Sequence, residues 1–391
     1  MFFRRKLFYL RRHPFTAAKI IFGLILFLTF CFLCSRYFKQ SKSVEVVKGK
    51  SAAQSNLGKQ DNLLEEPLTF LVLGLDSRKG DYRPRCDAIH LITFSPPEDK
   101  VIITSVPRGV EVDLEGVATA SAYLGNSCHI KGIDFAMDEI ERITSLQPDY
   151  LVKINFSQAL GVLRILNLPT TPALQFLRDR RSYFYGDNQR SHNQAVFLKD
   201  MMVNHLERAA SLPRPMKRLI FKMVEVEGLD FSTGEAILNW LVARDFSLNP
   251  DKIELVTKPS QFQIRYDVHF EEDNFSKQES WQNDQEFQDY QEELRKYLEA
   301  LAKGGANYLA SSQKNSAYEL LKTPFSQQLW LQLEDDRLRH QLHFDLLEVY
   351  VLSLEDKKEA SSLLQDFKAE MEIYGEEELK NKAEELLASL S

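Results

Sequence analysis

The chain has few cysteines and no cysteine–histidine pattern of the kind that holds zinc. Its 391 residues include four cysteines, with no pair of CxxC motifs and no HExxH motif. Structural zinc and zincin sites use such ligands at short, regular spacing, so neither is predicted. Two of the four cysteines lie in an apolar segment near the N-terminus, which leaves Cys86 and Cys128. An oxidising compartment would permit a disulfide between them, but the sequence alone leaves their pairing open.

Acidic residues are absent from the first 43 positions. An uncharged apolar run occupies residues 20–34, close to the short limit of about 17–25 residues for a membrane-spanning helix. Six basic side chains precede it: Arg4, Arg5, Lys6, Arg11, Arg12 and Lys19, which is able to snorkel. The run lacks a following small-x-small cleavage signal, which disfavours a signal peptide and leaves a buried core helix as the other alternative. We predict a cytoplasmic stub and a single transmembrane anchor at residues 1–37, which place the main domain extracytoplasmically at the cell membrane.

Features of a nucleic-acid-binding protein are also missing. The net charge is −7 and no helix-turn-helix pattern with a basic face is found, so nucleic acid is not a predicted partner. A content of 44% hydrophobic and 27% charged residues is typical of a folded protein. Residues 38–66 are rich in Ser, Lys, Gln and Asn, which predicts a flexible linker between the membrane and a folded domain.

Residues 67–260 have the pattern of an α/β domain. β-Branched apolar runs that end in charged or turn-forming clusters predict buried strands at 68–73, 88–94 and 101–106. The short SPPEDK segment between the last two favours an antiparallel hairpin. A loop with one short strand is expected up to residue 127. Further helices and strands are predicted at 131–143, 149–155, 157–166 with Ser157 as N-cap, 212–224, 232–242 and 252–257. The alternation of strands and helices favours a layered α/β sheet.

Beyond residue 260 the chain becomes acidic and helix-rich. Apolar residues at helical spacing form stripes, which are usually core: Phe287, Tyr290, Leu294, Tyr297 and Leu301, then Leu363, Leu364, Phe367, Met371 and Tyr374, then Leu379, Ala383, Leu386 and Leu390. The Gly304–Gly305 pair is expected to break the first helix, because glycine is a poor helix former. Residues 261–391 are therefore predicted to be an α-helical extension that packs on the domain or on a protein partner.

Charged side chains gather at the ends of the first three predicted strands. Asp76 and Arg78 follow the first strand, Arg85 and Asp87 flank the start of the second, and Arg108 follows the third. If these strands are neighbours in one sheet, two carboxylates and several guanidinium groups meet at its edge. Carboxylates suit a divalent cation and guanidinium groups suit phosphate, so the combination favours a phosphate site with a metal ion.

A second cluster of polar side chains lies between residues 173 and 199. Arg178 and Arg180 are two residues apart and point the same way on an extended segment. A helix that begins near Arg190 places Arg190 and Gln194 on one face. Four such donors are suited to wrapping a diphosphate, and a solvated basic loop is the alternative on spacing alone. Three histidines lie near these segments, His90, His129 and His192, and they are interpreted as structural, with a role as catalytic base as the alternative.

The order of several segments resembles the LytR-CpsA-Psr family over residues 66–260. The segments are FLVLGLDSR, RCDAIHLITFSP, VIITSVPRG, ASAYLGN, DYLVKINFSQ and LRDRRSYFYGDNQRSHNQ. The resemblance implies an extracytoplasmic α/β/α domain with a mixed central sheet. It further implies transfer of a glycopolymer from a polyprenyl-pyrophosphate carrier to a cell wall acceptor, assisted by Mg²⁺. An apolar groove under the sheet would hold the prenyl chain.

The resemblance also implies roles for individual residues. Asp76 and Asp87 match the metal-associated carboxylates and, with Arg108, the catalytic set. Six further positions match substrate-binding residues: Arg78, Arg85, Arg178, Arg180, Arg190 and Gln194.

This chain departs from the family pattern at four positions. Gly109 stands where the family has an aspartate after Pro-Arg, Ala118 where it has a lysine, Asn193 where it has an arginine, and Cys86 where it has a serine. The first three departures remove charges from the predicted site. They motivate an alternative hypothesis, in which the protein binds polyprenyl phosphate or acts as a scaffold of the cell envelope without catalysis.

Overall fold

A computed structural model provides the fold of the chain. It divides into two compact units, Met1–Gly58 and Lys59–Ser391, and the residues that the structure describes belong to the second. They are 66–76, 83–168, 170, 173, 176–177, 186–243, 249–262, 264, 267–269 and 285–390. The predicted anchor and most of the linker lie outside these ranges, as do Arg78, Arg178 and Arg180. Among the described residues, no helix has the length and apolar character needed to cross a membrane.

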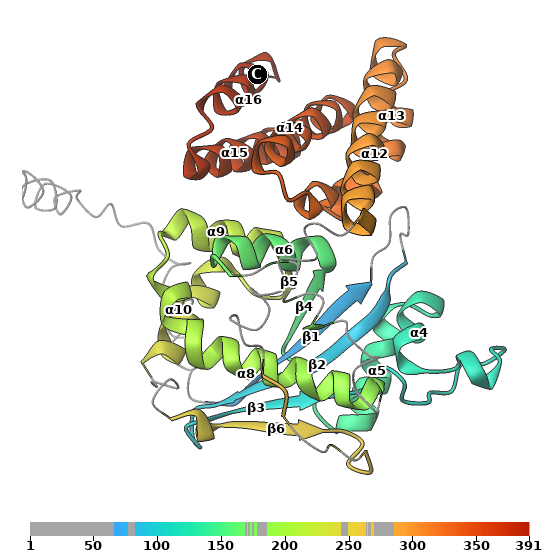
Figure 1. Cartoon of the computed structure of the whole chain (residues 1–391), viewed down its shortest axis with the longest axis vertical. Coiled ribbons are helices and arrows are strands. Elements are labelled where there is room, and N and C mark those ends of the chain that lie inside the picture. Colours follow the sequence, from blue (N-terminus) through green and yellow to red (C-terminus); the bar gives the residue numbers. More distant parts are fainter. Residues whose placement is uncertain are drawn as a thin grey trace, which may run out of the picture. The chain divides into compact units, whose positions relative to one another are not determined.

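The centre of the domain is a mixed, six-stranded sheet with the order β5-β4-β1-β2-β3-β6 (Figure 1). Its strands are β1 (Leu68–Asp76), β2 (Arg85–Ser95), β3 (Lys100–Ser105), β4 (Tyr150–Asn155), β5 (Glu225–Glu227) and β6 (Ile253–Thr257). The β1–β2, β2–β3 and β4–β5 pairs are antiparallel, whereas β1–β4 and β3–β6 are parallel. The predicted hairpin between β2 and β3 and the mixed sheet are thus confirmed.

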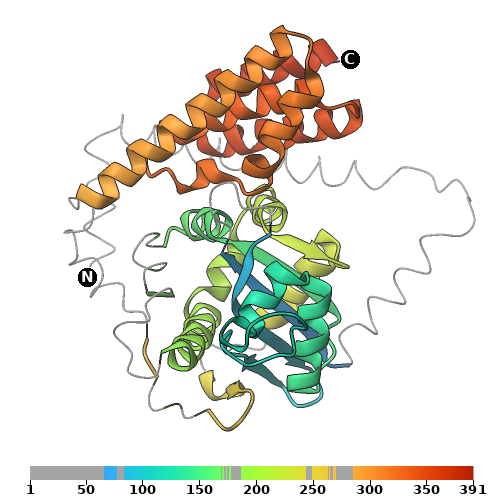
Figure 2. The ribbon, with the colours of Figure 1, turned by 90° about the vertical axis from the view of Figure 1, so that its right-hand side faces the viewer.

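Helices cover both faces of this sheet. Alternate residues of a strand point to opposite faces, so Leu71 and Leu73 of β1 belong to one apolar core and Phe70 to another. The first core includes α4 (Leu124–Ile130) and α5 (Ile133–Thr144). On the opposite face lie α6 (Phe156–Ile165), α8 (Asp187–Ser211) and α10 (Phe231–Val242), with α9 (Arg214–Met223) beside α6. Figures 1 and 2 show α8 and the α4–α5 pair on opposite sides of the strands.

The start of α6 differs from the prediction in its capping residue. Asn155 rather than Ser157 is the N-cap, because its side chain accepts a hydrogen bond from the Gln158 backbone N–H at 2.9 Å. The Gln158 side chain accepts in return from the Asn155 N–H at 2.8 Å, which completes a capping box. The Ser157 hydroxyl instead pairs with Gln332 Nε2 at 2.8 Å. A distant residue therefore uses the hydroxyl that the local pattern assigned to the cap.

The stretch before α4 is also more ordered than a plain loop. The sequence predicts a loop with one short strand up to residue 127. The structure has an isolated β-bridge between Glu111 and Tyr123 and a short 3-10 helix, η1 (Thr119–Ser121). The helix α4 then begins at Leu124, whose buried side chain packs into the first core.

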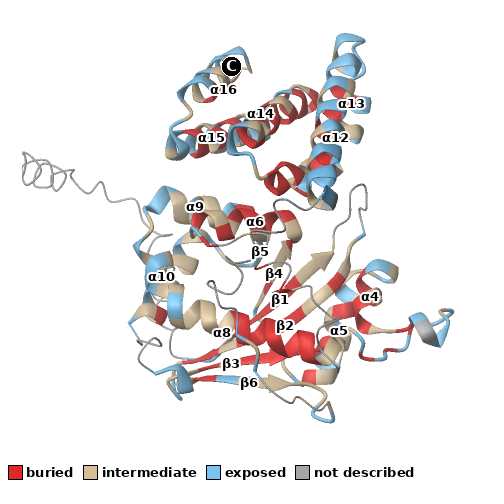
Figure 3. Cartoon of the chain, viewed as in Figure 1, coloured by how far each residue is buried: buried red, intermediate tan, exposed pale blue. Residues whose placement is uncertain are grey.

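The C-terminal region is helical, as predicted. It consists of α12 (Gln285–Ala310), α13 (Lys314–Ser326), the 3-10 helix η3 (Leu329–Gln332), α14 (Asp336–Ser353), α15 (Lys357–Tyr374) and α16 (Glu377–Leu390). Most members of the predicted stripes are buried, including Leu294, Leu301, Leu364, Phe367 and Met371. Figure 3 shows the buried residues on the faces that these helices turn toward one another.

The predicted helix break at Gly304–Gly305 is wrong, because α12 continues to Ala310. A Cβ atom added to Gly305 would lie 2.6 Å from Val349 Cγ1 of α14 and 3.3 Å from Leu321 Cδ1 of α13. The glycine is needed for the close approach of three helices. Packing energy from this contact offsets the poor helix propensity of glycine.

Alanine substitutions at these two glycines should have opposite effects on stability. At Gly304 an added Cβ meets only Leu320 Cδ2, at 3.3 Å, so Gly304→Ala should raise the free energy of unfolding by up to about 1 kcal/mol through helix propensity. At Gly305 the branched side chain of Val349 occupies the space that an added Cβ would need. Gly305→Ala should therefore lower the free energy of unfolding by about 1–3 kcal/mol. Thermal unfolding of the two variants tests this. Equal shifts in Tm would contradict the packing explanation.

Candidate functional site

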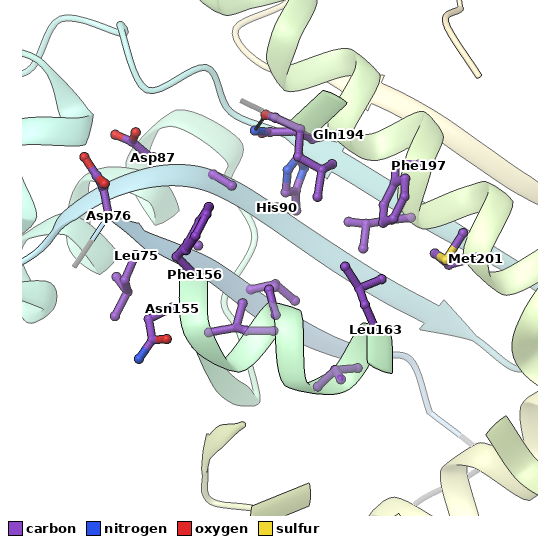
Figure 4. Close-up of a pocket in the computed structure, with 18 of the residues that line it drawn as sticks. Leu75, Asp76, Asp87, His90, Asn155, Phe156, Leu163, Gln194, Phe197 and Met201 are labelled. Carbon is purple, nitrogen blue, oxygen red and sulfur yellow. Dashed lines mark hydrogen bonds between the residues drawn. The ribbon is translucent and has the colours of Figure 1, made fainter. Parts of the chain in front are cut away.

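A β-bulge between β1 and β2 sets the direction of the two predicted carboxylates. Gly74 pairs with Ala88, but the next residue, Leu75, pairs with Cys86, so Asp87 has no cross-strand partner. A bulge re-aims the side chain of its extra residue. Asp76 at the end of β1 and Asp87 consequently line the same pocket, and Figure 4 shows them close to each other at one end of it.

Arginines pair with both carboxylates. Arg85 Nη2 lies 3.0 Å from Asp76 Oδ2, and Arg108 Nη1 pairs with Asp87 Oδ1. Arg108 also donates from Nε to Asp187 Oδ2 at 3.2 Å. Burial lowers the pKa of Arg108, but Asp87 and Asp187 raise it by more, so the net shift is upward. Arg108 is therefore a permanent positive charge held between two carboxylates.

The helix α8 brings two further predicted residues to this site. Arg190 and Gln194 are both buried and line the same pocket as Asp76 and Asp87, in agreement with a shared helix face. Arg190 Nη2 lies 3.2 Å from Asp187 Oδ1 and donates to the Asp87 carbonyl oxygen at 3.2 Å. Gln194 Nε2 donates to the Leu177 carbonyl oxygen at 2.8 Å. The strand-end cluster and the helix are thus joined through Asp87 and Asp187.

Asp187 is a site residue that the sequence analysis did not single out. It is the first residue of α8. It accepts a hydrogen bond from Arg108, which follows β3, and pairs with Arg190 of its own helix. Gly186–Asp187 has the pattern of a turn. Acidic residues are also common in the first turn of a helix, where they interact favourably with the helix dipole. The one sequence signal for a role is its spacing of three residues before Arg190. A Cβ atom at Gly109 would lie 3.9 Å from Asp187 Oδ2, so this carboxylate lies beside the position that lacks the family's aspartate.

The pocket behind these charges is apolar. It has a volume of about 370 Å³ and lies between the sheet and the helices α6 and α8. Its walls include Val72, Phe156, Leu163, Phe197, Leu198 and Met201. Figure 4 shows the change from carboxylates at one end to apolar side chains at the other. A cavity of this kind suits an amphiphile with a charged head and a hydrocarbon chain.

The donor set at the mouth is compatible with Mg²⁺ but does not form a complete protein cage. Among the described residues, no group of three or more His, Cys, Asp or Glu side chains could hold a metal ion. Mg²⁺ commonly takes one or two carboxylates and completes its shell with water and substrate phosphates. Asp76 and Asp87 fit that pattern, since both line the pocket and carboxylate oxygens are the ligands that Mg²⁺ prefers.

A disulfide joins Cys86 to Cys128 directly beside the site, so the structure decides the pairing that the sequence left open. It ties the start of β2, one residue before Asp87, to α4. The helix packs tightly here, because a Cβ at Gly125 of α4 would lie 2.9 Å from Arg108 Cβ and 3.0 Å from the Cys86 carbonyl oxygen. The crosslink and this contact hold Asp87 and Arg108 against the same helix.

Removing the disulfide should destabilise the protein. The crosslink spans 42 residues, and the double variant Cys86→Ser, Cys128→Ser should lose about 2–5 kcal/mol of unfolding free energy, since the unfolded chain gains freedom. Urea unfolding of the full-length chain in detergent measures the difference. The matched control is Cys31→Ser with Cys34→Ser, and an equal midpoint for both double variants would contradict the expectation.

The C-terminal extension contacts the wall of the pocket from behind. Arg164 of α6 donates to the carbonyl oxygens of Leu331 and Leu333, the latter at 3.2 Å, and pairs with Glu334 at 3.3 Å. A Cβ at Gly161 of α6 would lie 3.1 Å from Leu331 Cδ1. Because α6 also lines the pocket, the extension and the pocket share one helix.

Comparisons with known proteins agree with these features. The LytR_cpsA_psr family model matches residues 33–160. A polyisoprenyl-teichoic acid–peptidoglycan teichoic acid transferase, TagU of Bacillus cereus, is 23% identical over 143 residues, which cover 36% of this chain and 46% of TagU. TagU of Halalkalibacterium halodurans is 26% identical over 102 residues, or 25% of this chain and 33% of that protein. The chain thus spans at most about half the length of these curated relatives.

Among solved structures, TagV of B. subtilis matches with a TM-score of 0.38 and 18% identity, and covers 55% of this chain and 94% of that chain. A structure of TagT bound to LIIa-WTA also has a TM-score of 0.38, with 17% identity, and covers 55% of this chain and 83% of that chain. The family match includes the segments that carry Asp76, Asp87 and Arg108. Residues 33–160, about a third of the chain, thus belong to the LytR-CpsA-Psr family.

Proposed function

We propose that this protein is a membrane-anchored, extracytoplasmic phosphotransferase. It moves a glycopolymer from a polyprenyl-pyrophosphate carrier to a cell wall acceptor. The observation that carries the proposal is one pocket with an apolar interior and a mouth formed by Asp76, Asp87 and Arg190, with Arg108 paired to Asp87. A polyprenyl diphosphate has the complementary division into a hydrocarbon chain and an anionic head.

The reaction transfers a phosphoryl group between oxygen atoms. The acceptor hydroxyl oxygen forms a bond to the phosphorus that carries the glycopolymer, and its proton passes to a base. The bond from that phosphorus to the oxygen bridging to the lipid phosphate breaks, and the lipid monophosphate leaves. Phosphoryl transfer depends mainly on positioning and charge neutralisation, which arginines can supply.

Individual residues have separate tasks in this proposal. Arg85, Arg108 and Arg190 bind the phosphate oxygens, together with Gln194. Asp76 and Asp87 would hold Mg²⁺, which when bound supplies further positive charge to the diphosphate. Arg78, Arg178 and Arg180 are proposed to complete the phosphate-binding set. The helical extension is proposed to contact a protein partner.

Release of a lipid monophosphate tests the proposal. The full-length protein in detergent is incubated with Mg²⁺ and a short polyprenyl diphosphate, and the lipid product is quantified. Release should require Mg²⁺ and should be lost in Asp76→Ala. The exposed Asp138 of α5 provides the matched control, and Asp138→Ala should retain full activity.

One observation favours a second function, a binding protein or scaffold without turnover. Gly109 supplies no carboxylate at this position. Asp187 lies beside it, but the Asp187 carboxylate is paired with two arginines. Tight binding of the polyprenyl diphosphate without release would support this function. Gly109→Asp would then be the variant to test for a gain of turnover.

A further inference from the structure

A buried histidine lies in the pocket and has no role in the proposed reaction. His90 of β2 is 2% exposed and lines the pocket. Its Nδ1 is 3.2 Å from the hydroxyl oxygen of Ser105, its partner in the β2–β3 register. Its Nε2 is buried and has no hydrogen-bond partner among the described residues. A buried polar atom without a partner costs free energy, so an occupant of the pocket that pairs with it is favoured.

The position of His90 is the boundary between the two halves of the pocket. Along α8, the lining residues change from Arg190 to Gln194 and then to Phe197 and Met201. Figure 4 shows the His90 ring directed toward Gln194, between the two aspartates and the apolar side chains. A ligand with a charged head and a hydrocarbon chain has its junction at this depth.

The imidazole is neutral and is suited to donating from Nε2. Burial lowers the pKa of His90 to about 4. The nearby Gln194 side chain opposes this shift, and the positive charge of Arg190 adds to it. Gln194 uses its Nε2 to donate to the Leu177 carbonyl oxygen. The tautomer in which the Ser105 hydroxyl donates to Nδ1 carries its proton on Nε2.

We propose that His90 is the specificity-determining residue of this pocket, and that its Nε2–H donates to an oxygen of the phosphate group attached to the apolar chain. The inference rests on the proposed function, because it assumes that a lipid phosphate occupies the pocket. A neutral donor at the junction selects chains that carry a phosphate over chains of the same length without one. It also sets how deep the head lies relative to Arg108 and Arg190.

Two probes with the same chain test this selectivity, farnesyl monophosphate and farnesol. Their affinities are measured by titration of the full-length protein in detergent, for the wild type, His90→Leu and His90→Gln. His90→Leu should weaken binding of the monophosphate roughly 10-fold, the value of one lost hydrogen bond to a charged group, and leave farnesol binding unchanged. His90→Gln retains an N–H donor and should recover part of the loss. Tm values of the variants show whether the fold is retained.

The outcomes separate this inference from the proposed function. If the wild type prefers the monophosphate and His90→Leu keeps that preference, the role of His90 is overturned and the proposed function stands. Equal losses for both probes in His90→Leu and in His90→Gln would also overturn it, because they indicate a change of pocket shape. A wild type that binds neither probe overturns the inference together with the proposed function.

Discussion

Replacing Arg108 with glutamine should reduce release of lipid monophosphate roughly 100- to 1000-fold, the effect of removing one preorganised charge from a transition-state site. Arg108 contacts Asp87 through Nη1 and Asp187 through Nε, so it links the β2 carboxylate to the first turn of α8. Its loss removes positive charge from the diphosphate and leaves two carboxylates without their shared partner. Single-turnover rates at saturating polyprenyl diphosphate measure the change.

Two further variants make this result interpretable. Arg142→Gln removes an exposed arginine that pairs with Glu139 on α5, and it should leave the rate unchanged. Arg108→Lys keeps the charge but offers a single nitrogen in place of the two that contact Asp87 and Asp187, so it should restore little activity. Full activity in Arg108→Lys would show that charge alone is needed. Full activity in Arg108→Gln would remove Arg108 from the site.

Replacing Arg164 with leucine should lower the unfolding free energy by about 1–3 kcal/mol and weaken lipid binding. The partly buried guanidinium pairs with Glu334 and donates to the Leu331 and Leu333 carbonyl oxygens, and all three lose a partner. Burial and the nearby charge of Arg339 lower the pKa of Arg164, as expected for a cation held inside the protein. Because α6 also lines the pocket, we expect that loss of this contact also weakens the binding of the lipid chain in the pocket.

Arg295→Leu is the matched control for Arg164. Arg295 forms ion pairs with Glu292 and Glu299, but on the surface of α12, where such pairs contribute little. Urea unfolding and farnesyl monophosphate titration of both variants measure the two effects. If Arg164→Leu lowers stability without changing lipid affinity, the extension braces the domain without influencing the pocket.

Local patterns in the sequence predict which residues gather at much of the candidate site. Asp76, Arg85, Asp87 and Arg108 were identified because polar residues at strand ends meet when the strands are neighbours, which the sheet order shows. Arg190 and Gln194 were identified from a spacing of four residues on one helix, and both line the pocket. The proximity of these residues follows from helix and strand periods, which act over a few residues, and their roles at the site stay predictions.

Predictions failed or stayed open where a distant residue decides the outcome. Ser157 has good local chemistry for an N-cap, but Gln332 takes its hydroxyl. Gly305 has poor helix propensity, but Val349 requires a residue without a side chain there. The pairing of Cys86 with Cys128 depends on how α4 packs on β2, which their spacing cannot indicate.

The sequence by itself determined the class of the domain, the helical character of the extension and most of the polar residues at the pocket mouth. Each of these follows from hydrophobic period and residue type within short segments. Only the tertiary structure decided which polar groups share partners: the bulge that turns Asp87 beside Asp76, the bridge of Asp187 between two arginines, and the position of His90 at the polar–apolar boundary. These depend on contacts between residues far apart in the chain, whose free energies arise only when strands and helices pack together.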